Sequence, residues 1–569
     1  MMRLKGFLSL LFFMLTQIAV AQQVFNSVET VFNGKGGDES IAKEAFYKKI
    51  TPGTQKQIQD FILHTLYAKG FIAARIDSSE ADSNKLKVWV FTGQKYIWHS
   101  LDFSPEAKAA LSEKGFRQEK LSDVGFSTAR LNVLFDLVLS YYENRGYPFA
   151  AVKLDSIKIE DNKIRALMSV DKKEPVVIDT VLINGTADIS PYFIYNLTGI
   201  RPGDNYNEAK VAALSKNINN PEFLSMKKAP EIMFGKGTAL VKLTVNNNKS
   251  NTFDGIVGFY TDAQTGKLAV NGNFKLKLTN SLKSGETFKI NWQRPTTGNQ
   301  SLNIFYSQPY LFKSRFGIDY TFDLYRQDSS FMNISNKPLA AYRFTPDNFI
   351  SAQATFFTSQ LVAGNKDSTR QEFSSNTFGV GFGYAALDYR VNPRKGYAVK
   401  GSVEAGNKKT NGDEQNRTQG IKPARALGNF NAEWFIPLFK NSTMRLLNST
   451  AVLLSQEIYN NELFRIGGFK SLRGFDEQSI WCSSYSVFDI EYRFLFARNS
   501  NLTLFYNFAY TEKKTTAGFS SDWPMGFGAG MNFDTGAGIM SIFYAIGRQQ
   551  NNSLRFGNSK IHFGYSVKF

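Results

Sequence analysis

The residue types that most often carry out protein chemistry are sparse in this sequence. It contains three histidines, His64, His99 and His562, and a single cysteine, Cys482. The histidines lack the i, i+4 spacing of a helical metal site, and neither a Gly-x-Ser-x-Gly elbow nor a phosphate-binding glycine loop occurs. The sequence therefore favours a protein that is not an enzyme and that uses no cofactor and no metal.

The chemistry that remains is the pairing of charges around one glycine-rich segment. Residues 464 to 475 read FRIGGFKSLRGF, with a single arginine at the end of the motif, Arg473. Shortly afterwards Asp489 and Glu491 stand two residues apart, so in a strand both acids project from one face together with Arg493. A guanidinium removed from water needs a carboxylate partner. What positions these groups depends on the sheet around them.

The N-terminal segment indicates export. Arg3 and Lys5 precede an apolar run that ends in the small residues Ala19 and Ala21. This pattern is typical of a cleavable signal peptide over residues 1 to 21, with Gln22 as the first mature residue. A membrane anchor is the alternative, but the apolar run is short and is interrupted by polar residues. With one cysteine, the exported chain has no intramolecular disulfide.

The composition favours a membrane β-barrel. Among 569 residues, 14% are aromatic, with 51 Phe and 25 Tyr, yet the mean hydropathy is only -0.27. A strand that faces lipid on one side alternates apolar and polar residues, which gives this combination. The net charge of +18 lacks the basic clusters with stacking aromatics that nucleic-acid binding needs. It fits anionic lipid head groups or a cationic lumen.

The first half of the chain contains a repeat. LYAKGFIAARI (66 to 76) and ENRGYPFAAVKL (143 to 154) share a helix that ends on glycine before a strand. A third copy is indicated because AFYKKITPGT (45 to 54) matches YNLTGIRPGD (195 to 204). The period is about 75 residues. We expect three modules of strand, helix, helix, strand, strand over residues 22–93, 94–174 and 175–249, each with an open sheet edge that an extended client can pair with.

From about residue 250 the helical periodicity gives way to alternating strands. KLAVNGNFKLKLT (267 to 279) and the last segment, IHFGYSVKF, each have one apolar and one polar face. The segments number 16 between residues 250 and 569, and an even number suits a closed antiparallel barrel. A β-sandwich is the alternative. The fold class expected is α+β modules followed by an all-β transmembrane barrel of 16 strands.

The glycine-rich segment carries a family resemblance. It lies between the eleventh strand (442 to 457) and the twelfth (484 to 496), so residues 458–483 form the sixth extracellular loop. The chain resembles the BamA/TamA superfamily of outer-membrane assembly and secretion barrels, and three repeats are most similar to its TamA branch. The repeats look like POTRA domains of the periplasm. The family's loop motif is matched by Gly467, Gly468, Leu472, Arg473, Gly474 and Phe475.

The resemblance also implies where the arginine binds. In the family it contacts an aspartate on the inner wall of strand thirteen, within Phe-x-Asp-x-Gly, which corresponds here to Phe505 through Ala509. Asn507 stands where the family has the acid. We expect Arg473 to pair with Asp489 or Glu491, while Asn507 adds a neutral hydrogen bond and Phe505 lies beside them.

A second set of residues implied by the resemblance lies on the last strand. Family barrels end on an aromatic residue that the cell's assembly machinery reads as a sorting signal. The matching residues are Phe563, Tyr565, Val567 and Phe569.

The function that the resemblance implies is insertion or translocation of unfolded client proteins in the bacterial outer membrane, without nucleotide hydrolysis. The partners expected are outer-membrane or secreted clients, outer-membrane lipids and accessory periplasmic or lipoprotein subunits, with no nucleic acid. Three alternatives remain at this point: a two-partner secretion pore for one dedicated client, a passive channel or adhesin-type barrel, and a lipase-like barrel, since a Ser/His pair needs no local motif.

Overall fold

The computed structural model describes residues 24–25, 27–33, 53–82, 85–116, 124–261, 268–294, 299–328, 330–362, 369–410, 424–550, 557 and 559–568. The expected signal peptide, the expected helix near residues 45 to 49 and Phe569 lie outside these ranges. The chain divides into two compact units, one built mainly from residues up to Asp179 and one that ends with Phe569.

The first module combines a three-stranded sheet with a helix. The sheet has the order β2-β5-β4, with β2 parallel and β4 antiparallel to β5. Thr54 caps the helix in a capping box with Gln57, and Ile58, Ile62 and Leu66 cover the sheet. The elements are β1 (Val24–Phe25), β2 (Ser27–Asn33), β3 (Gly53–Thr54), α3 (Gln55–Ala68), β4 (Arg75–Asp82) and β5 (Lys85–Phe91).

The second module repeats this arrangement with a second helix. Its sheet has the order β7-β6-β9-β8, so β8 is an edge strand. Ser104 and Ser127 cap the two helices, whose apolar faces share one core with the sheet. The elements are β6 (Ile97–Phe103), α4 (Pro105–Glu113), β7 (Val124–Gly125), α5 (Thr128–Glu143), β8 (Ala151–Glu160) and β9 (Lys163–Asp171).

Equivalent glycines end α3 and α5. Gly70 and Gly146 both have φ of 99°, a conformation that residues with a Cβ rarely adopt. The next residue then closes the helix, since Phe71 N donates to Leu66 O at 3.0 Å and Tyr147 N donates to Tyr142 O at 3.1 Å. The shared geometry agrees with the repeat read from the sequence.

The third module has shorter helices and a sheet of order β10-β13-β12. Among the described residues, no helix has the length and apolar character needed to cross a membrane. Its elements are β10 (Val177–Asn184), α6 (Pro191–Thr198), α7 (Glu208–Ala212), α8 (Leu214–Ile218), β11 (Leu224–Ser225), β12 (Glu231–Phe234), β13 (Thr238–Thr244) and β14 (Asn246–Asn247).

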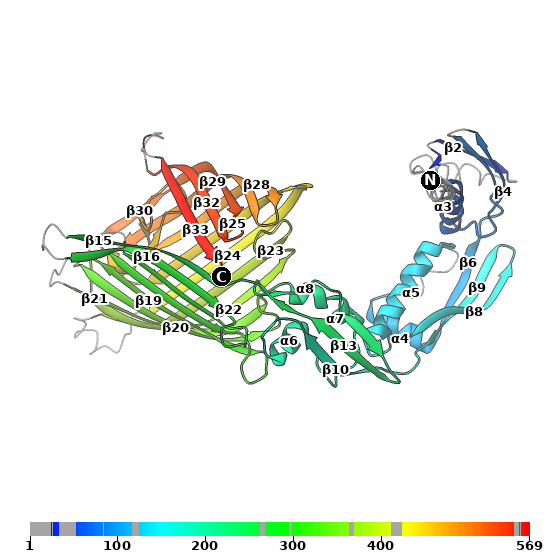
Figure 1. The fold of residues 1–569 in the computed structure, drawn as a ribbon, viewed down its shortest axis with the longest axis horizontal. Coiled ribbons are helices and arrows are strands. Elements are labelled where there is room, and N and C mark those ends of the chain that lie inside the picture. Colours follow the sequence, from blue (N-terminus) through cyan, green and yellow to red (C-terminus); the bar gives the residue numbers. More distant parts are fainter. Residues whose placement is uncertain are drawn as a thin grey trace, which may run out of the picture. The chain divides into compact units, whose positions relative to one another are not determined.

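The rest of the chain is a closed antiparallel barrel (Figure 1). Seventeen labelled segments form 16 spanning strands, because β30 and β31 both pair with β29 and continue one another across Trp523 and Pro524. This confirms the expected fold class. The segments are β15 (Thr252–Thr261), β16 (Leu268–Thr279), β17 (Thr287–Arg294), β18 (Gln300–Gln308), β19 (Phe316–Gln327), β20 (Phe331–Arg343), β21 (Phe349–Leu361), β22 (Phe373–Leu387), β23 (Gly396–Thr410), β24 (Ala424–Phe439), β25 (Ser442–Ser455), β28 (Ser484–Ala497), β29 (Ser500–Thr515), β30 (Gly518–Asp522), β31 (Met525–Asp534), β32 (Gly538–Arg548) and β33 (Lys560–Lys568).

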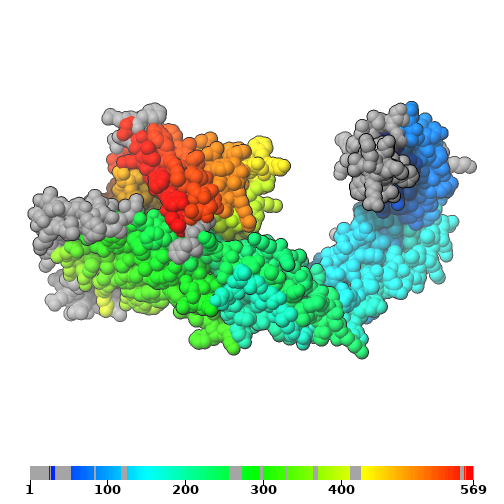
Figure 2. All heavy atoms as spheres, viewed as in Figure 1, coloured from blue at the N-terminus to red at the C-terminus, as the bar shows by residue number. Residues whose placement is uncertain are grey.

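Alternation along each strand separates the outer face from the lumen. On β29 the aromatic Tyr506 points outward with 41% of its surface exposed, whereas its neighbours Phe505 and Asn507 are buried on the inner side. The barrel closes where the C-terminal strand β33, red in Figures 1 and 2, meets the green first strands. The barrel strands also bury charged side chains, among them Glu404, Lys408 and Arg425, so the inner wall can hold ionic groups.

Candidate functional site

The connection between β25 and β28 folds into the barrel as an ordered unit, which we call loop 6. It contains a short 3-10 helix, η2 (Asn460–Glu462), and a hairpin of β26 (Phe464–Ile466) and β27 (Ile480–Cys482). Its apolar residues form a buried cluster with the barrel wall, made by Ile466, Leu472, Phe475, Ile480, Cys482, Val487 and Ala509. Burial raises the pKa of the Cys482 thiol to about 12, so this cysteine is protonated at neutral pH.

The motif glycines form the tip of the hairpin. Gly467 and Gly468 have φ of 110° and 99°, and Gly468 N donates to Leu472 O at 3.0 Å to close a tight turn. A Cβ on Gly474 would lie 2.7 Å from the backbone nitrogen of Gly547 on β32. The tip therefore packs directly against the backbone of the barrel wall, which a larger residue at position 474 would prevent.

Arg473 lies at the centre of a buried ionic cluster. Its Nη2 is 2.7 Å from Glu491 Oε1 and 2.5 Å from Asp489 Oδ2, both on β28. Arg473, Asp489 and Glu491 expose only 6%, 7% and 3% of their surfaces. The guanidinium also stacks on the ring of Phe505, whose centroid lies 3.9 Å from Cζ.

Two further arginines complete the cluster. Arg445 on β25 reaches Glu491 at 3.1 Å, Asp489 at 3.3 Å and Glu433 at 3.2 Å, while Arg493 binds Glu491 through Nε at 2.6 Å. Three cations thus face three carboxylates. Such balance is needed because an unpaired charge in this position is destabilising.

The structure corrects one expectation about this cluster. Asn507 lies on the inner face as its phase requires, with 1% of its surface exposed, but among the described residues its Oδ1 has no hydrogen-bond partner. The neutral hydrogen bond to Arg473 is therefore not made. Asn507 stands directly opposite Asp489 in the β28–β29 ladder. Asp489 therefore supplies the carboxylate for Arg473, and the amide opposite it carries no charge.

A second ionic anchor of loop 6 lies outside the sequence motif. Glu462 in η2 is fully buried between Lys408 of β23 and Arg425 of β24 and pairs with both. The neighbouring Asn461 donates to Ser359 Oγ at 2.7 Å and accepts from Asn333 at 2.7 Å. Sequence reasoning missed this anchor, because its only local signal was a charged residue near the start of a loop.

The seam between the first and last strands has little backbone pairing. Within the described residues, β15 and β33 share two residue pairs, Thr252–Lys568 and Phe253–Val567, whereas all ten residues of β15 pair with β16. On the outer face of β33, Phe563 exposes 67% of its surface and Tyr565 and Val567 are half-buried. Phe569, the last residue of the expected sorting set, lies outside the described ranges.

The tip of loop 6 contacts one side of this seam and interacts by charge with the other. On the β33 side, Asp476 pairs with Lys560 at 2.8 Å, and the ring of Phe469 lies 5.8 Å from that of His562. On the β15 side, the charge of Lys470 interacts with those of Asp254 and Lys275. The hairpin therefore contacts β33 and carries a charge that acts on Asp254 of β15.

Fold and site together define an outer-membrane β-barrel protein whose N-terminal modules lie in the periplasm. Residues 280–569 match the model of the Omp85 superfamily domain. The chain belongs to the Omp85 superfamily, which confirms the resemblance seen in the sequence. Members of this superfamily insert proteins into the outer membrane or secrete them across it.

Two solved CdiB structures support the fold, and a BamA structure is also similar. CdiB from Escherichia coli is 14% identical, with 84% of this chain and 91% of that chain covered and a TM-score of 0.52. CdiB from Acinetobacter baumannii is 12% identical, with 84% and 90% covered and a TM-score of 0.51. BamA from Haemophilus ducreyi lacking POTRA domains 1–3 is 13% identical, with 84% and 99% covered and a TM-score of 0.42. A search among curated proteins found no match.

Proposed function

We propose that this protein inserts client proteins into the outer membrane at the seam of its barrel, without nucleotide hydrolysis. The observation that carries the proposal is the short ladder between β15 and β33. In lipid each unpaired backbone group costs several kcal/mol, so the long unpaired edges of β15 and β33 favour an incoming strand. A client strand that pairs with them satisfies these groups and enters the bilayer sideways.

Loop 6 has the role of a brace in this proposal. Its contacts with Lys560 and His562 on β33, together with the interaction of Lys470 with Asp254 on β15, hold the two edges in register while no client is bound. Arg473 fixes the brace to β28 through Asp489 and Glu491. Opening of the seam then requires the tip of loop 6 to release one edge.

The periplasmic modules are proposed to bind the client first. The edge strand β8 of the second module pairs only with β9 among the described strands. It exposes 54% of Ile157 and 50% of Ile159. An extended apolar client segment fits this edge by strand addition. The proposed modules retain the boundaries 22–93, 94–174 and 175–249, with outer-membrane lipids and accessory subunits as further partners.

A disulfide across the seam tests the proposal. Phe253 and Val567 are directly opposite in the ladder, which gives cysteines a Cα distance suited to a disulfide. Buried Cys482 does not compete, because its thiol stays protonated. We expect the oxidised F253C/V567C variant to lose client insertion in reconstituted vesicles and to regain it on reduction.

A matched control places the disulfide in a fully paired part of the wall. Ile290 and Ile304 are opposite each other in the β17–β18 ladder, and the oxidised I290C/I304C variant should insert clients normally. If the locked seam inserts clients as well as the reduced form, insertion at the seam is wrong. Continued export of a client through the locked barrel would instead indicate a secretion pore.

A further inference from the structure

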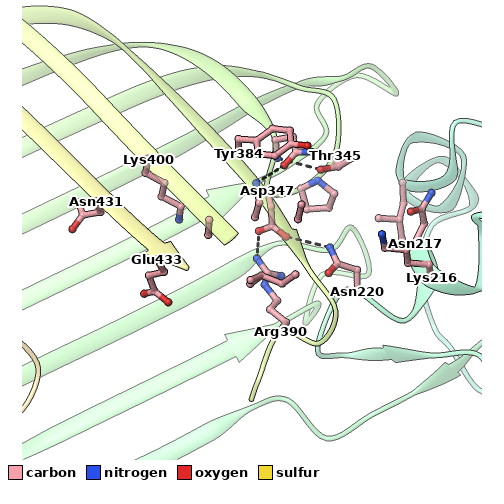
Figure 3. A pocket seen from close by; sticks show the side chains of 17 residues that line it. Lys216, Asn217, Asn220, Thr345, Asp347, Tyr384, Arg390, Lys400, Asn431 and Glu433 are labelled. Carbon is pink, nitrogen blue, oxygen red and sulfur yellow. Dashed lines mark hydrogen bonds and ion pairs between the residues drawn. The ribbon is translucent and has the colours of Figure 1, made fainter. Parts of the chain in front are cut away.

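Two adjoining cavities lie at the periplasmic mouth of the lumen. The first, about 570 Å³, is lined by α8 and Asn220 of the third module, by the turn around Asp347 and by the inner wall of β22, β23 and β24. The second, about 640 Å³, shares Lys216, Asn220 and Arg390 with the first. All lining residues belong to the second compact unit. In Figure 3, Lys216 and Lys400 face the first cavity from opposite sides.

The carboxylates that line the first cavity are already bound. Asp347 pairs with Arg390 and accepts a hydrogen bond from Asn220 at 3.1 Å. Glu433 pairs with Arg445 at 3.2 Å. Within the part of the chain that the structure describes, no carboxylate lies in ion-pair distance of Lys216 or Lys400. The free charge of this cavity is therefore positive.

The second cavity extends the positive charge. It adds Lys227, Lys249 and Arg498 to the shared cations. Of its two acids, Glu222 is bound by Lys277 of the barrel wall, and Asp388 accepts hydrogen bonds from the main-chain N–H groups of Tyr389 and Arg394 at 2.8 and 3.0 Å. On the neighbouring barrel wall, Lys289 of β17 lies close enough to Lys277, Lys400 and Arg390 for their charges to interact, and it sits directly opposite Lys277 in the ladder. Glu222 offsets the charge of Lys277, so Lys289 is the member of this pair that adds positive charge to the region.

We propose that these cavities form a cationic vestibule that binds acidic extended segments of polypeptide before they reach the lumen. Lys216 and Lys400 are the residues expected to bind the ligand carboxylates, and Asn217, Asn220 and Asn431 offer amides to its backbone. This inference rests on the proposed function in one respect, since it assumes that the chain handles client polypeptides. It names the chemical class of the client segment that enters first.

The position of the cavities favours a polypeptide over a lipid. Lys400, Asn431 and Glu433 lie on the strands β23 and β24 with their side chains in the first cavity, within the mouth of the lumen. A lipid head group in the surrounding bilayer would instead meet the outward, lipid-facing sides of these strands. The amide-rich lining also suits a backbone that carries unpaired N–H and C=O groups.

The test uses the full mature protein in detergent micelles and two extended peptides of equal length. One peptide carries Asp and Glu at alternate positions, and the other carries Lys at the same positions. A benzoylphenylalanine introduced at Leu387, which lines both cavities, reports binding inside the vestibule by photo-crosslinking, and fluorescence anisotropy gives the affinity. We expect the acidic peptide to crosslink and the basic peptide to fail, with affinity that falls as salt rises.

Charge reversal identifies the residues. The K216E/K400E variant should weaken binding of the acidic peptide by up to about fivefold for each lysine and should bind the basic peptide better than the wild type. The K228E/K236E variant is the matched control, because it makes the same change of charge at two exposed lysines outside both cavities.

Three outcomes would overturn the inference. They are equal crosslinking of both peptides, an equal loss of affinity in the control variant, and displacement of the acidic peptide by anionic lipid micelles but not by excess unlabelled peptide. The assay measures binding without insertion. A failure of the seam disulfide test would therefore not affect the peptide-binding result, and a failure of peptide binding would not affect the seam test.

Discussion

At the scale of single residues, the position of the acid beside Arg473 is the most informative detail. Asp489 faces Asn507 across the β28–β29 ladder, and the arginine takes the acid while the amide oxygen stays without a hydrogen bond. Two neighbouring strands thus present equivalent places for one carboxylate. The cluster constrains the number of charges more than it constrains the strand that carries them.

This arrangement predicts that a carboxylate at position 507 can replace the carboxylate at position 489. The D489N variant should lower the thermal midpoint of barrel unfolding, because removing one partner of a buried ion pair costs about 3–5 kcal/mol. The D489N/N507D variant should recover most of that loss, since the new carboxylate lies across the ladder from the old one. Heat-modifiable mobility on gels measures the midpoint.

The control replaces the same amide without adding charge. D489N/N507S should be no more stable than D489N alone. Equal midpoints for D489N and D489N/N507D would mean that position 507 is out of reach of Arg473.

Sequence reasoning at this scale succeeded where phase decides the answer. Alternation along β28 places Asp489 and Glu491 on the same side, where Arg473 of loop 6 binds both. The same reasoning gave Asn507 the right face and the wrong contact, because a hydrogen bond also depends on side-chain distance and on which neighbour binds more strongly. A carboxylate outcompetes an amide for a guanidinium.

At the scale of elements, loop 6 is held at two places on the wall. Glu462 fixes its beginning to β23 and β24, and Arg473 fixes its tip to β28. The first anchor could not be read from the sequence, because Lys408, Arg425 and Glu462 come together only when the barrel has closed. The hairpin β26–β27 begins just after the first anchor and carries the second anchor in its loop, so it depends on both.

The first anchor can be tested separately from the tip. In E462Q one buried carboxylate is lost while Lys408 and Arg425 stay buried, so a cost of about 3–5 kcal/mol is expected. Loop 6 should then become open to protease added outside intact cells, measured as cleavage between residues 456 and 483. E457Q is the control, because Glu457 is exposed and Lys408 binds only its main-chain oxygen at 2.9 Å. Unchanged cleavage in E462Q would contradict the anchor.

At the scale of the whole molecule, the third module is fastened to the periplasmic rim of the barrel. Phe193 of α6 lies between Phe223 and Tyr310, with ring centroids 5.7 and 5.4 Å away, and a Cβ on Gly285 would collide with its ring. Asn196 donates to Ser314 O at 3.1 Å. These residues all belong to one compact unit.

The rim contact predicts the effect of one substitution. F193A should cost about 3–5 kcal/mol of local stability, because it removes a buried aromatic ring. The junction near residue 250 should then be cleaved faster by limited proteolysis of the purified protein. Y192A is the control, since Tyr192 is exposed and loses only ring contacts with Lys313 and Tyr195. Equal rates in F193A and the wild type would contradict the role of Phe193.

The strand number and the repeat followed from periodicity, but the rim contact did not. Alternation and turn spacing are local signals and survive in a single sequence. The fit of Phe193 against Tyr310 depends on residues more than 100 positions apart, and no local pattern records it. The cationic vestibule could not be predicted from the sequence either. Its unpaired lysines can be identified only once the structure shows which cation each acid binds.

The apolar cluster of loop 6 has an electrical consequence. With Ile466, Leu472 and Phe475 buried against the inner wall and the loop anchored at its beginning and its tip, the lumen should offer ions a narrow and poorly hydrated path. In a planar bilayer the resting protein should therefore be nearly silent, and E462Q should produce current bursts as the loop swings out. Single-channel current through one barrel would then show when loop 6 has detached from the inner wall.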